Sequence, residues 1–162
     1  MELIWDRLFG AEEFVTHATL VDTHPLPVSS VAFSPDGRYI YSGGEAHELR
    51  IYDRISRTST SDPIGAYKIY TILAFADGER LALIRGDGQV LIWGLPERKV
   101  RRRLLGHKAP VRRILLADHD ETLISQDEGG EVRIWDVRSG ESRVLATMDD
   151  WAKTLEWHAP TR

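Results

Sequence analysis

Residues 28–43 read VSSVAFSPDGRYIYSG, and two later stretches repeat their pattern, YTILAFADGERLALIRG at 70–86 and VRRILLADHDETLISQ at 111–126. Superposition of the three stretches places Phe33, Phe75 and Leu116 at the same phase, with steps of 42 and 41 residues. One further step of 41 residues reaches Trp157. A period of about 20 to 50 residues indicates a repeat architecture, in which each repeat needs its neighbours to bury its apolar face.

A second landmark, the aromatic residue that ends each unit, keeps the same period. It falls at Tyr52 in LRIYD, Trp93 in VLIWG and Trp135 in VRIWD, with steps of 41 and 42 residues. The two landmarks lie 19, 18 and 19 residues apart in the three units. Two independent features that keep one phase over three units predict an internal repeat.

Each unit reads as short antiparallel strands. Apolar and polar residues alternate with period two, as in Val132 and Ile134 around Arg133, which is typical of a strand with one buried face. Ser34-Pro35-Asp36-Gly37 combines a preset φ at proline with a glycine that tolerates positive φ, and so predicts a tight turn between the first two strands. Ala76-Asp77-Gly78 reads as the same turn shortened by one residue.

The rest of each unit predicts two more strands, so that each unit has four, which we letter a to d in chain order. Asp87-Gly88 and Gly129-Gly130 mark the next hairpin, before the strand that ends in tryptophan. The segments 99–105 and 142–147 read as a fourth strand that is charged and alternates poorly. Charge on an outer strand discourages edge-to-edge pairing with other sheets. We therefore expect an all-β fold of four-stranded antiparallel sheets.

The phased motifs resemble those of the WD-repeat (WD40) β-propeller family. They are Gly106-His107, Phe33-Ser34-Pro35-Asp36-Gly37 and Ile134-Trp135-Asp136. The resemblance spans almost the whole chain. It implies blades of four-stranded sheets, arranged around a ring and repeating every ~40–45 residues.

The strand count predicts one partial propeller over residues 1–162, with an incomplete ring. We expect strands c and d of an incomplete blade at 1–27, blades at 28–69, 70–110 and 111–151, and strand a of another incomplete blade at 152–162. A helix over residues 1–9 is the alternative at the N-terminus. Because rings hold roughly four to eight blades, we expect the remaining blades to come from a longer chain, a second polypeptide or another copy of this one.

Composition excludes several classes of protein and site. The sequence has 162 residues, a formal charge of −4 and no cysteine, which excludes disulfides, thiolate catalysis and zinc sites built on sulfur. The longest apolar run, Ile72 to Ala76, is far shorter than the ~20 residues of a membrane-spanning helix, so we expect no membrane insertion. The N-terminus shows no secretory signal, which favours a cytoplasmic or nuclear setting.

Nothing in the sequence indicates a catalytic or metal site. It has no P-loop, Gly-x-Gly-x-x-Gly, Gly-x-Ser-x-Gly or His-Glu-x-x-His motif, so we expect neither an enzyme nor a cofactor. Asp118-His119-Asp120 and Glu45-Ala46-His47-Glu48 fall in turns between strands, where polar residues are solvated. We therefore expect no metal site.

The resemblance also implies a structural hydrogen-bond tetrad of His, Ser or Thr, Asp and Trp in each blade. The matching residues are His24, Ser42 and Tyr52 in the first unit, Asp87 and Trp93 in the second, and His107, Ser125 and Trp135 in the third. Ala66 and Met148 stand where histidine is expected, and Ala46 and Gly129 where aspartate is expected. We therefore expect no complete tetrad, and structural roles for these histidines.

The family most often binds partners at the narrow face of its ring, where the d–a and b–c connections emerge. Candidate partner-binding residues in the d–a connections are Tyr67, Lys108 and Trp151, and Leu26 marks the corresponding place in the first of these connections. The b–c hairpins add the candidates His47 and Asp87. An exposed aromatic or basic residue on such a surface is typical of an interaction hot spot.

A basic run, Arg98 to Arg103 with Lys108, Arg112 and Arg113, allows two interpretations. It is either a solvated outer strand or a docking patch, through Arg101, Arg103 and Arg112, for an acidic partner segment, for RNA or for anionic lipid. The resemblance implies a non-catalytic protein–protein interaction scaffold within a multiprotein complex. The alternatives are a scaffold associated with nucleic acid and a regulatory domain of a larger enzyme assembly.

Overall fold

The computed structural model describes residues 24–117 and 120–148. Its strands are β1 (Val28–Phe33), β2 (Tyr39–Gly44), β3 (Glu48–Asp53), β4 (Thr58–Pro63), β5 (Ile69–Ala74), β6 (Arg80–Arg85), β7 (Val90–Gly94), β8 (Lys99–Leu104), β9 (Val111–Ala117), β10 (Thr122–Asp127), β11 (Glu131–Asp136) and β12 (Ser142–Thr147). The expected strands within 1–27 fall almost entirely, and the expected strand at 152–162 entirely, outside the described residues, as does Trp157.

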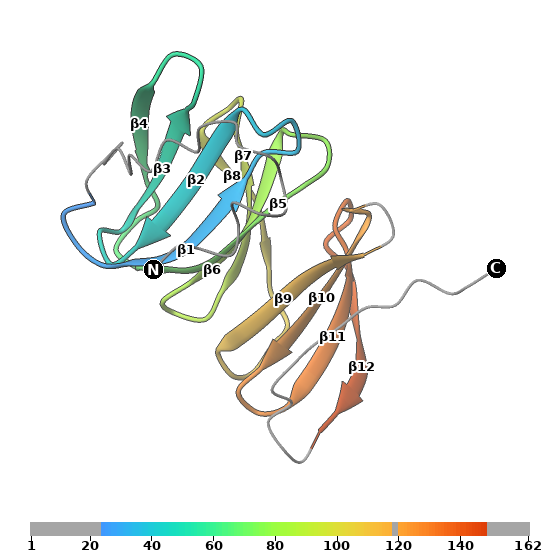
Figure 1. Ribbon diagram of the computed structural model, residues 1–162. Coiled ribbons are helices and arrows are strands. Elements are labelled where there is room, and N and C mark those ends of the chain that lie inside the picture. The colour runs from blue at the N-terminus through green and yellow to red at the C-terminus, as the bar shows by residue number, and fades with distance from the viewer. Residues whose placement is uncertain (1–23, 118–119, 149–162) are drawn as a thin grey trace, which may run out of the picture.

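The strands form three antiparallel four-stranded sheets in chain order, β1 to β4, β5 to β8 and β9 to β12 (Figure 1). This confirms the expected all-β fold. The middle sheet contacts both others, through β1 and β2 on one side and β9 on the other. Ile69, which the expected limits assign to the first blade, is the first residue of β5.

The turns between the first two strands of sheets one and two have the same length, so the expected shortening is wrong. The amide of Gly37 donates to the carbonyl of Ser34, and that of Gly78 donates to the carbonyl of Phe75. Both glycines have positive φ, 69° and 68°. Phe75 of sheet two is therefore equivalent to Ser34 of sheet one. The residue equivalent to Phe33 is Ala74, and not Phe75 as the superposed sequences suggest.

With this correction both landmarks repeat at the same spacing: equivalent residues are 41 residues apart between sheets one and two, and 42 residues apart between sheets two and three. The additional residue of the second step is a β-bulge in β8. Ile92 pairs with Arg102 and Trp93 with Val100, which leaves Arg101 without a partner across β7. The corresponding pairing of β3 with β4 is unbroken. A bulge and basic side chains together protect β8 as an outer strand.

Apolar side chains pack between the sheets. The cluster between sheets one and two is built around Tyr41, Leu49 and Leu83, and that between sheets two and three around Phe75 and Trp135. By contrast, Val31 and Phe33 of β1 are 56% and 58% exposed. Ala32, which lies between them, packs against the cluster shared with sheet two, so Val31 and Phe33 point to the other side of sheet one.

Polar contacts also join the sheets. The guanidinium of Arg102 donates to the carbonyls of Arg138 at 2.8 Å and Ser139 at 2.6 Å, linking β8 to the turn after β11. Arg98 reaches from sheet two to the carboxylate of Asp62 in β4, at 2.6 Å. In the part of the chain that the structure describes, no helix is long and apolar enough to cross a membrane.

Candidate partner-binding rim

The connections between the sheets and the second hairpin of each sheet lie at one end of the sheets. We call this end the rim; its segments are 24–27, 45–47, 64–68, 86–89, 105–110 and 128–130. The rim includes four of the five candidates from the connections and hairpins: Tyr67, His47 and Lys108 are exposed and Asp87 is half-buried. The fifth, Trp151, lies outside the described residues.

A buried arginine joins two of these candidates. The guanidinium of Arg85 lies 4.8 Å from the ring centre of Tyr67. It also donates to both carboxylate oxygens of Asp87, from Nε at 3.3 Å and from Nη2 at a shorter distance, and to Gln89 at 3.3 Å. The side chain of Arg85 is only 9% exposed, so its charge requires these partners. Tyr67, Arg85 and Asp87, the Arg85 cluster, therefore form one ordered unit.

The first strand of each of the three sheets carries a β-bulge next to the rim. The pairing skips Ser29 in β1, Tyr70 in β5 and Arg112 in β9. A bulge re-aims the side chain of its additional residue and bends the strand. Three equivalent positions therefore carry a hydroxyl, a phenol and a guanidinium, none of which the alternation of the sequence could reveal.

Two cations surround Tyr70. Lys68 Nζ lies 4.8 Å and the Arg112 guanidinium 5.4 Å from the centre of its ring. Hydrogen bonds from Lys68 and Arg112 lower the pKa of the Tyr70 hydroxyl, because they favour its ionised form. We call Lys68, Tyr70 and Arg112 the Tyr70 cluster. Sequence reasoning named Arg112 but missed the other two.

Sheet three contains a complete tetrad, which corrects the expectation that no blade has one. Trp135 Nε1 donates to Ser125 Oγ at 2.7 Å. His107 lies between Ser125 Oγ, 2.6 Å from its Nε2, and Asp127 Oδ2, 3.0 Å from its Nδ1. The aspartate stands eight residues before the tryptophan, at 127, whereas sequence reasoning placed it at Gly129.

The donors and acceptors of this tetrad have one consistent assignment. Indole nitrogen only donates, so Ser125 Oγ accepts from Trp135 and its own proton can go to His107 Nε2. A neutral His107 then carries its proton on Nδ1 and donates it to the Asp127 carboxylate. Burial lowers the pKa of His107 despite the neighbouring carboxylate, which agrees with a neutral ring.

The other two sheets lack this set. In sheet one His24 Nε2 lies 2.7 Å from Ser42 Oγ, while Gly44 stands eight residues before Tyr52, where sheet three has its aspartate. In sheet two, Leu83 and Arg85 occupy the serine and aspartate positions. Asp87 is therefore not a tetrad residue. The buried Nε1 of Trp93 has no hydrogen-bond partner among the described residues.

Among the described residues, one cluster of side chains could hold a metal, and its members already have partners within the chain. Ligand atoms of His107, Asp127 and Glu131 lie within 4.8 Å of one another, a cluster that sequence reasoning did not find. His107 and Asp127 belong to the tetrad, and Arg133 donates to Glu131 at 2.5 Å. The tetrad and this ion pair explain the arrangement without an ion.

The acidic residues of segments 45–48 and 118–120, which could supply metal ligands, either bond other groups of the chain or are not among the described residues. Glu45 contacts Lys68 at 3.6 Å and Glu48 accepts from Arg50 at 2.5 Å. Asp118 and His119 are not among the described residues, and Asp120 accepts from the amide of Ala76.

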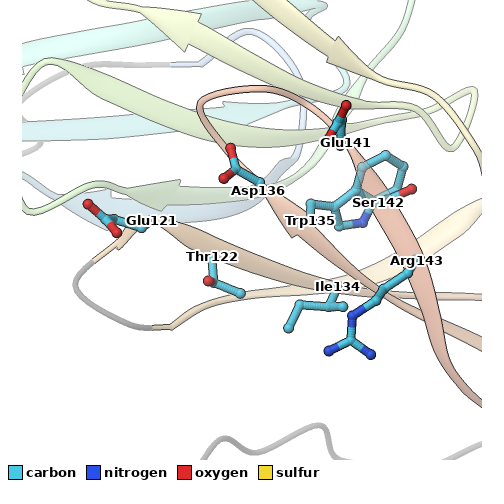
Figure 2. Close-up of a pocket in the computed structure, with 8 residues that line it drawn as sticks. All are labelled: Glu121, Thr122, Ile134, Trp135, Asp136, Glu141, Ser142 and Arg143. Carbon is cyan, nitrogen blue, oxygen red and sulfur yellow. The ribbon is translucent and has the colours of Figure 1, made fainter.

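A pocket of about 390 Å³ opens on sheet three, at the end opposite the rim (Figure 2). Its carboxylates belong to Glu121, Asp136 and Glu141, and Arg143 lies beside Ile134. Asp136 accepts from the amide of Ser139 at 2.6 Å, and this bond lowers the pKa of Asp136. The carboxylate of Asp136 therefore holds the turn between β11 and β12.

Most of the basic run is paired within the chain. Arg98 bonds Asp62, Arg101 bonds Glu97, Arg102 bonds two carbonyls, Arg103 contacts Gln89 and Arg112 bonds Glu128. Lys99, Arg101 and Arg103 are exposed on β8, whereas Arg102 is half-buried. The acidic partners reduce the potential that an RNA backbone would encounter at this strand.

The family model for the WD domain, G-beta repeat, matches residues 15–53 and 98–136. Target of rapamycin complex subunit wat1 of Schizosaccharomyces pombe is 33% identical over 82% of this chain and 41% of its own length. WD repeat-containing protein SL1-17 of Schistosoma mansoni is 27% identical over 85% of this chain and 44% of its own length. The chain thus spans about two fifths of the length of these relatives.

Two solved structures share its fold. The structure of U3-55K gives a TM-score of 0.72 over 80% of this chain and 42% of that one, at 18% identity. The crystal structure of RRP9 WD40 repeats gives 0.71, with the same identity and coverage. The family-model match, the similar proteins and the three repeated sheets together show that the chain is a divergent member of the WD-repeat (WD40) β-propeller family.

Proposed function

We propose that this chain is part of a non-catalytic scaffold that positions other proteins in a complex by binding them at the rim. WD-repeat propellers are generally non-catalytic scaffolds, and one similar protein is named as a subunit of the target of rapamycin complex. The proposed setting is the cytoplasm or the nucleus, with which the cysteine-free composition agrees.

The observation that carries the proposal is the Arg85 cluster. Tyr67 remains 44% exposed although Arg85 orders one side of its ring. An exposed aromatic residue held in place before binding loses little conformational freedom on contact, which makes it an effective anchor. Asp87 is fixed beside it by the same guanidinium.

The proposal includes further blades beyond the three described sheets. Val31 and Phe33 expose apolar surface on β1, on the side where sheets two and three each receive a neighbour. We propose that another blade covers this surface, supplied by a longer chain, a second polypeptide or another copy of this chain.

The test compares two variants of the tagged chain expressed in cells. Tyr67→Ala removes the exposed anchor at the rim. The matched control, Ile55→Ala, removes a side chain that is 75% exposed in the β3–β4 turn, at the opposite end of sheet one. We expect quantitative mass spectrometry to show that Tyr67→Ala loses co-purifying proteins that Ile55→Ala retains, while the circular dichroism of both variants matches that of the parent.

Retention of every partner by Tyr67→Ala would contradict binding at the rim. Partners that are lost from all variants after nuclease treatment would favour the RNA-associated scaffold instead. A co-purifying enzyme whose activity changes on removal of this chain would favour the regulatory domain.

A further inference from the structure

The Tyr70 cluster lies next to the rim, where Lys68 directly follows Tyr67 of the Arg85 cluster, and it indicates what kind of partner the rim binds. We propose that Lys68, Tyr70 and Arg112 bind a carboxylate of an acidic partner segment, while apolar side chains of the same segment contact Leu26 and Tyr67. This inference rests on the proposed function, because it assumes that partners dock at the rim.

The first argument is the convergence of two cations on one side chain, that of Tyr70. Lys68 precedes β5 and Arg112 belongs to β9, so the two cations come from different sheets and meet only in the folded chain. Lys68 Nζ lies 4.8 Å and the Arg112 guanidinium 5.4 Å from the ring centre of Tyr70, which is half-buried, and both cations lower the pKa of its hydroxyl. A site with two cationic donors around one acceptor favours a negatively charged oxygen over a neutral one.

The second argument is that the existing partners leave donors available. The contact between Lys68 and Glu45 is 3.6 Å long, and the two side chains are 36% and 49% exposed, so it is a weak and replaceable pair. Arg112 donates to Glu128 at 2.7 Å from Nε, and a guanidinium carries five N–H donors. An incoming carboxylate can therefore replace Glu45 without unpairing Arg112.

The third argument is the apolar surface on the same rim. Leu26 and Tyr67 are 50% and 44% exposed. They occupy equivalent positions of consecutive sheets, 41 residues apart. Lys108, one residue before the third equivalent position, Ala109, is exposed and adds a further positive charge. The rim thus presents apolar surface next to cations, which complements a segment of alternating apolar and acidic residues.

The experiment uses two capped peptides as probes, acetyl-Leu-Glu-Leu-Glu-amide and its uncharged analogue acetyl-Leu-Gln-Leu-Gln-amide. Binding to the 162-residue chain is followed through the NMR signals of the tyrosine rings, assigned with Tyr67→Phe and Tyr70→Phe. We expect the acidic peptide to shift both signals saturably, and the glutamine analogue to bind about fivefold more weakly, the loss expected for a partly exposed charge pair.

Two double variants localise the effect. Lys68→Ala with Arg112→Ala should weaken binding of the acidic peptide about fivefold, to the level of the glutamine analogue. The matched control, Lys99→Ala with Arg103→Ala, removes two equally charged residues from the outer strand β8 and should leave binding unchanged. Circular dichroism establishes that both variants are folded.

Equal binding of the two peptides, or an equal loss in the two double variants, would overturn the acidic site. If Tyr67→Ala loses cellular partners but the Lys68 and Arg112 variant keeps them, the scaffold stands and this inference fails. If the acidic peptide binds as expected but Tyr67→Ala keeps every partner, the proposed function fails and the acidic site stands.

Discussion

Single residues decide how each sheet satisfies its buried polar groups. Trp93 and Trp135 occupy the same position of consecutive sheets and are 4% and 1% exposed. Trp135 donates to Ser125, whereas Trp93 faces Leu83 at the serine position and has no partner among the described residues. The residue at the serine position thus decides whether the indole nitrogen is hydrogen-bonded.

This difference predicts unequal costs for the same substitution. Trp135→Phe and Trp93→Phe remove the same volume, but only the first removes a hydrogen bond and leaves Ser125 short of a donor. We expect Trp135→Phe to lower the free energy of unfolding by about 1 kcal/mol more than Trp93→Phe. Urea denaturation followed by circular dichroism measures both, and equal losses would contradict the assignment.

His107 predicts a dependence of stability on pH. Burial lowers its pKa below the usual value of about 6.5, so the unfolded chain binds a proton more readily than the folded one. The stabilising contribution of the neutral ring is present above pH ~6.5 and is lost as the pH falls through that value towards the lower pKa of the folded state. His107→Gln removes this titration.

We therefore expect the free energy of unfolding of the parent to fall more steeply than that of His107→Gln between about pH 7.5 and 5.5. Denaturant titrations at several pH values give both slopes. Parallel curves for the two proteins would show that His107 does not titrate differently on unfolding.

At the scale of elements, contacts between strands of different sheets fix how the sheets sit together. Arg102 illustrates this, because its guanidinium holds two carbonyls of the turn between β11 and β12. Arg103, its neighbour on β8, is exposed and makes one contact of 3.3 Å with Gln89 of its own sheet. The two arginines differ in position rather than in chemistry.

We expect Arg102→Ala to lower the free energy of unfolding by about 1 kcal/mol and Arg103→Ala by less than about 0.5 kcal/mol. Hydrogen–deuterium exchange gives a local measure. The turn at 136–141 should exchange faster in Arg102→Ala only. Faster exchange of this turn in both variants, or in neither, would contradict a bridge through Arg102.

At the scale of the whole molecule, the exposed side of sheet one predicts association. Val31 and Phe33 lie on a strand whose counterparts in sheets two and three pack against a neighbour. A charge at Phe33 should therefore weaken any contact that covers this surface, whereas a charge at a solvated turn should not.

We expect the purified chain to sediment as oligomers whose size grows with concentration, and Phe33→Arg to shift this equilibrium towards the monomer. Ile55→Arg, which places the same charge in the β3–β4 turn, serves as the control. A well-folded monomer at all concentrations, unaffected by either variant, would contradict the proposal that another blade covers sheet one.

The sequence by itself determined the repeat, the strand order within each unit and the presence of turns at Gly37 and Gly78, because period, alternation and turn chemistry are local properties of the chain. The tertiary structure decided which residue of the first sheet Phe75 corresponds to, that Asp127 is the aspartate of the tetrad, and that the side chain of Tyr70 points to Lys68 and Arg112. Each of these depends on register, and a single bulge residue changes which side chains meet without changing the pattern of residue types. Arg85 shows the same limit, since only folding brings Tyr67 and Asp87 to its guanidinium.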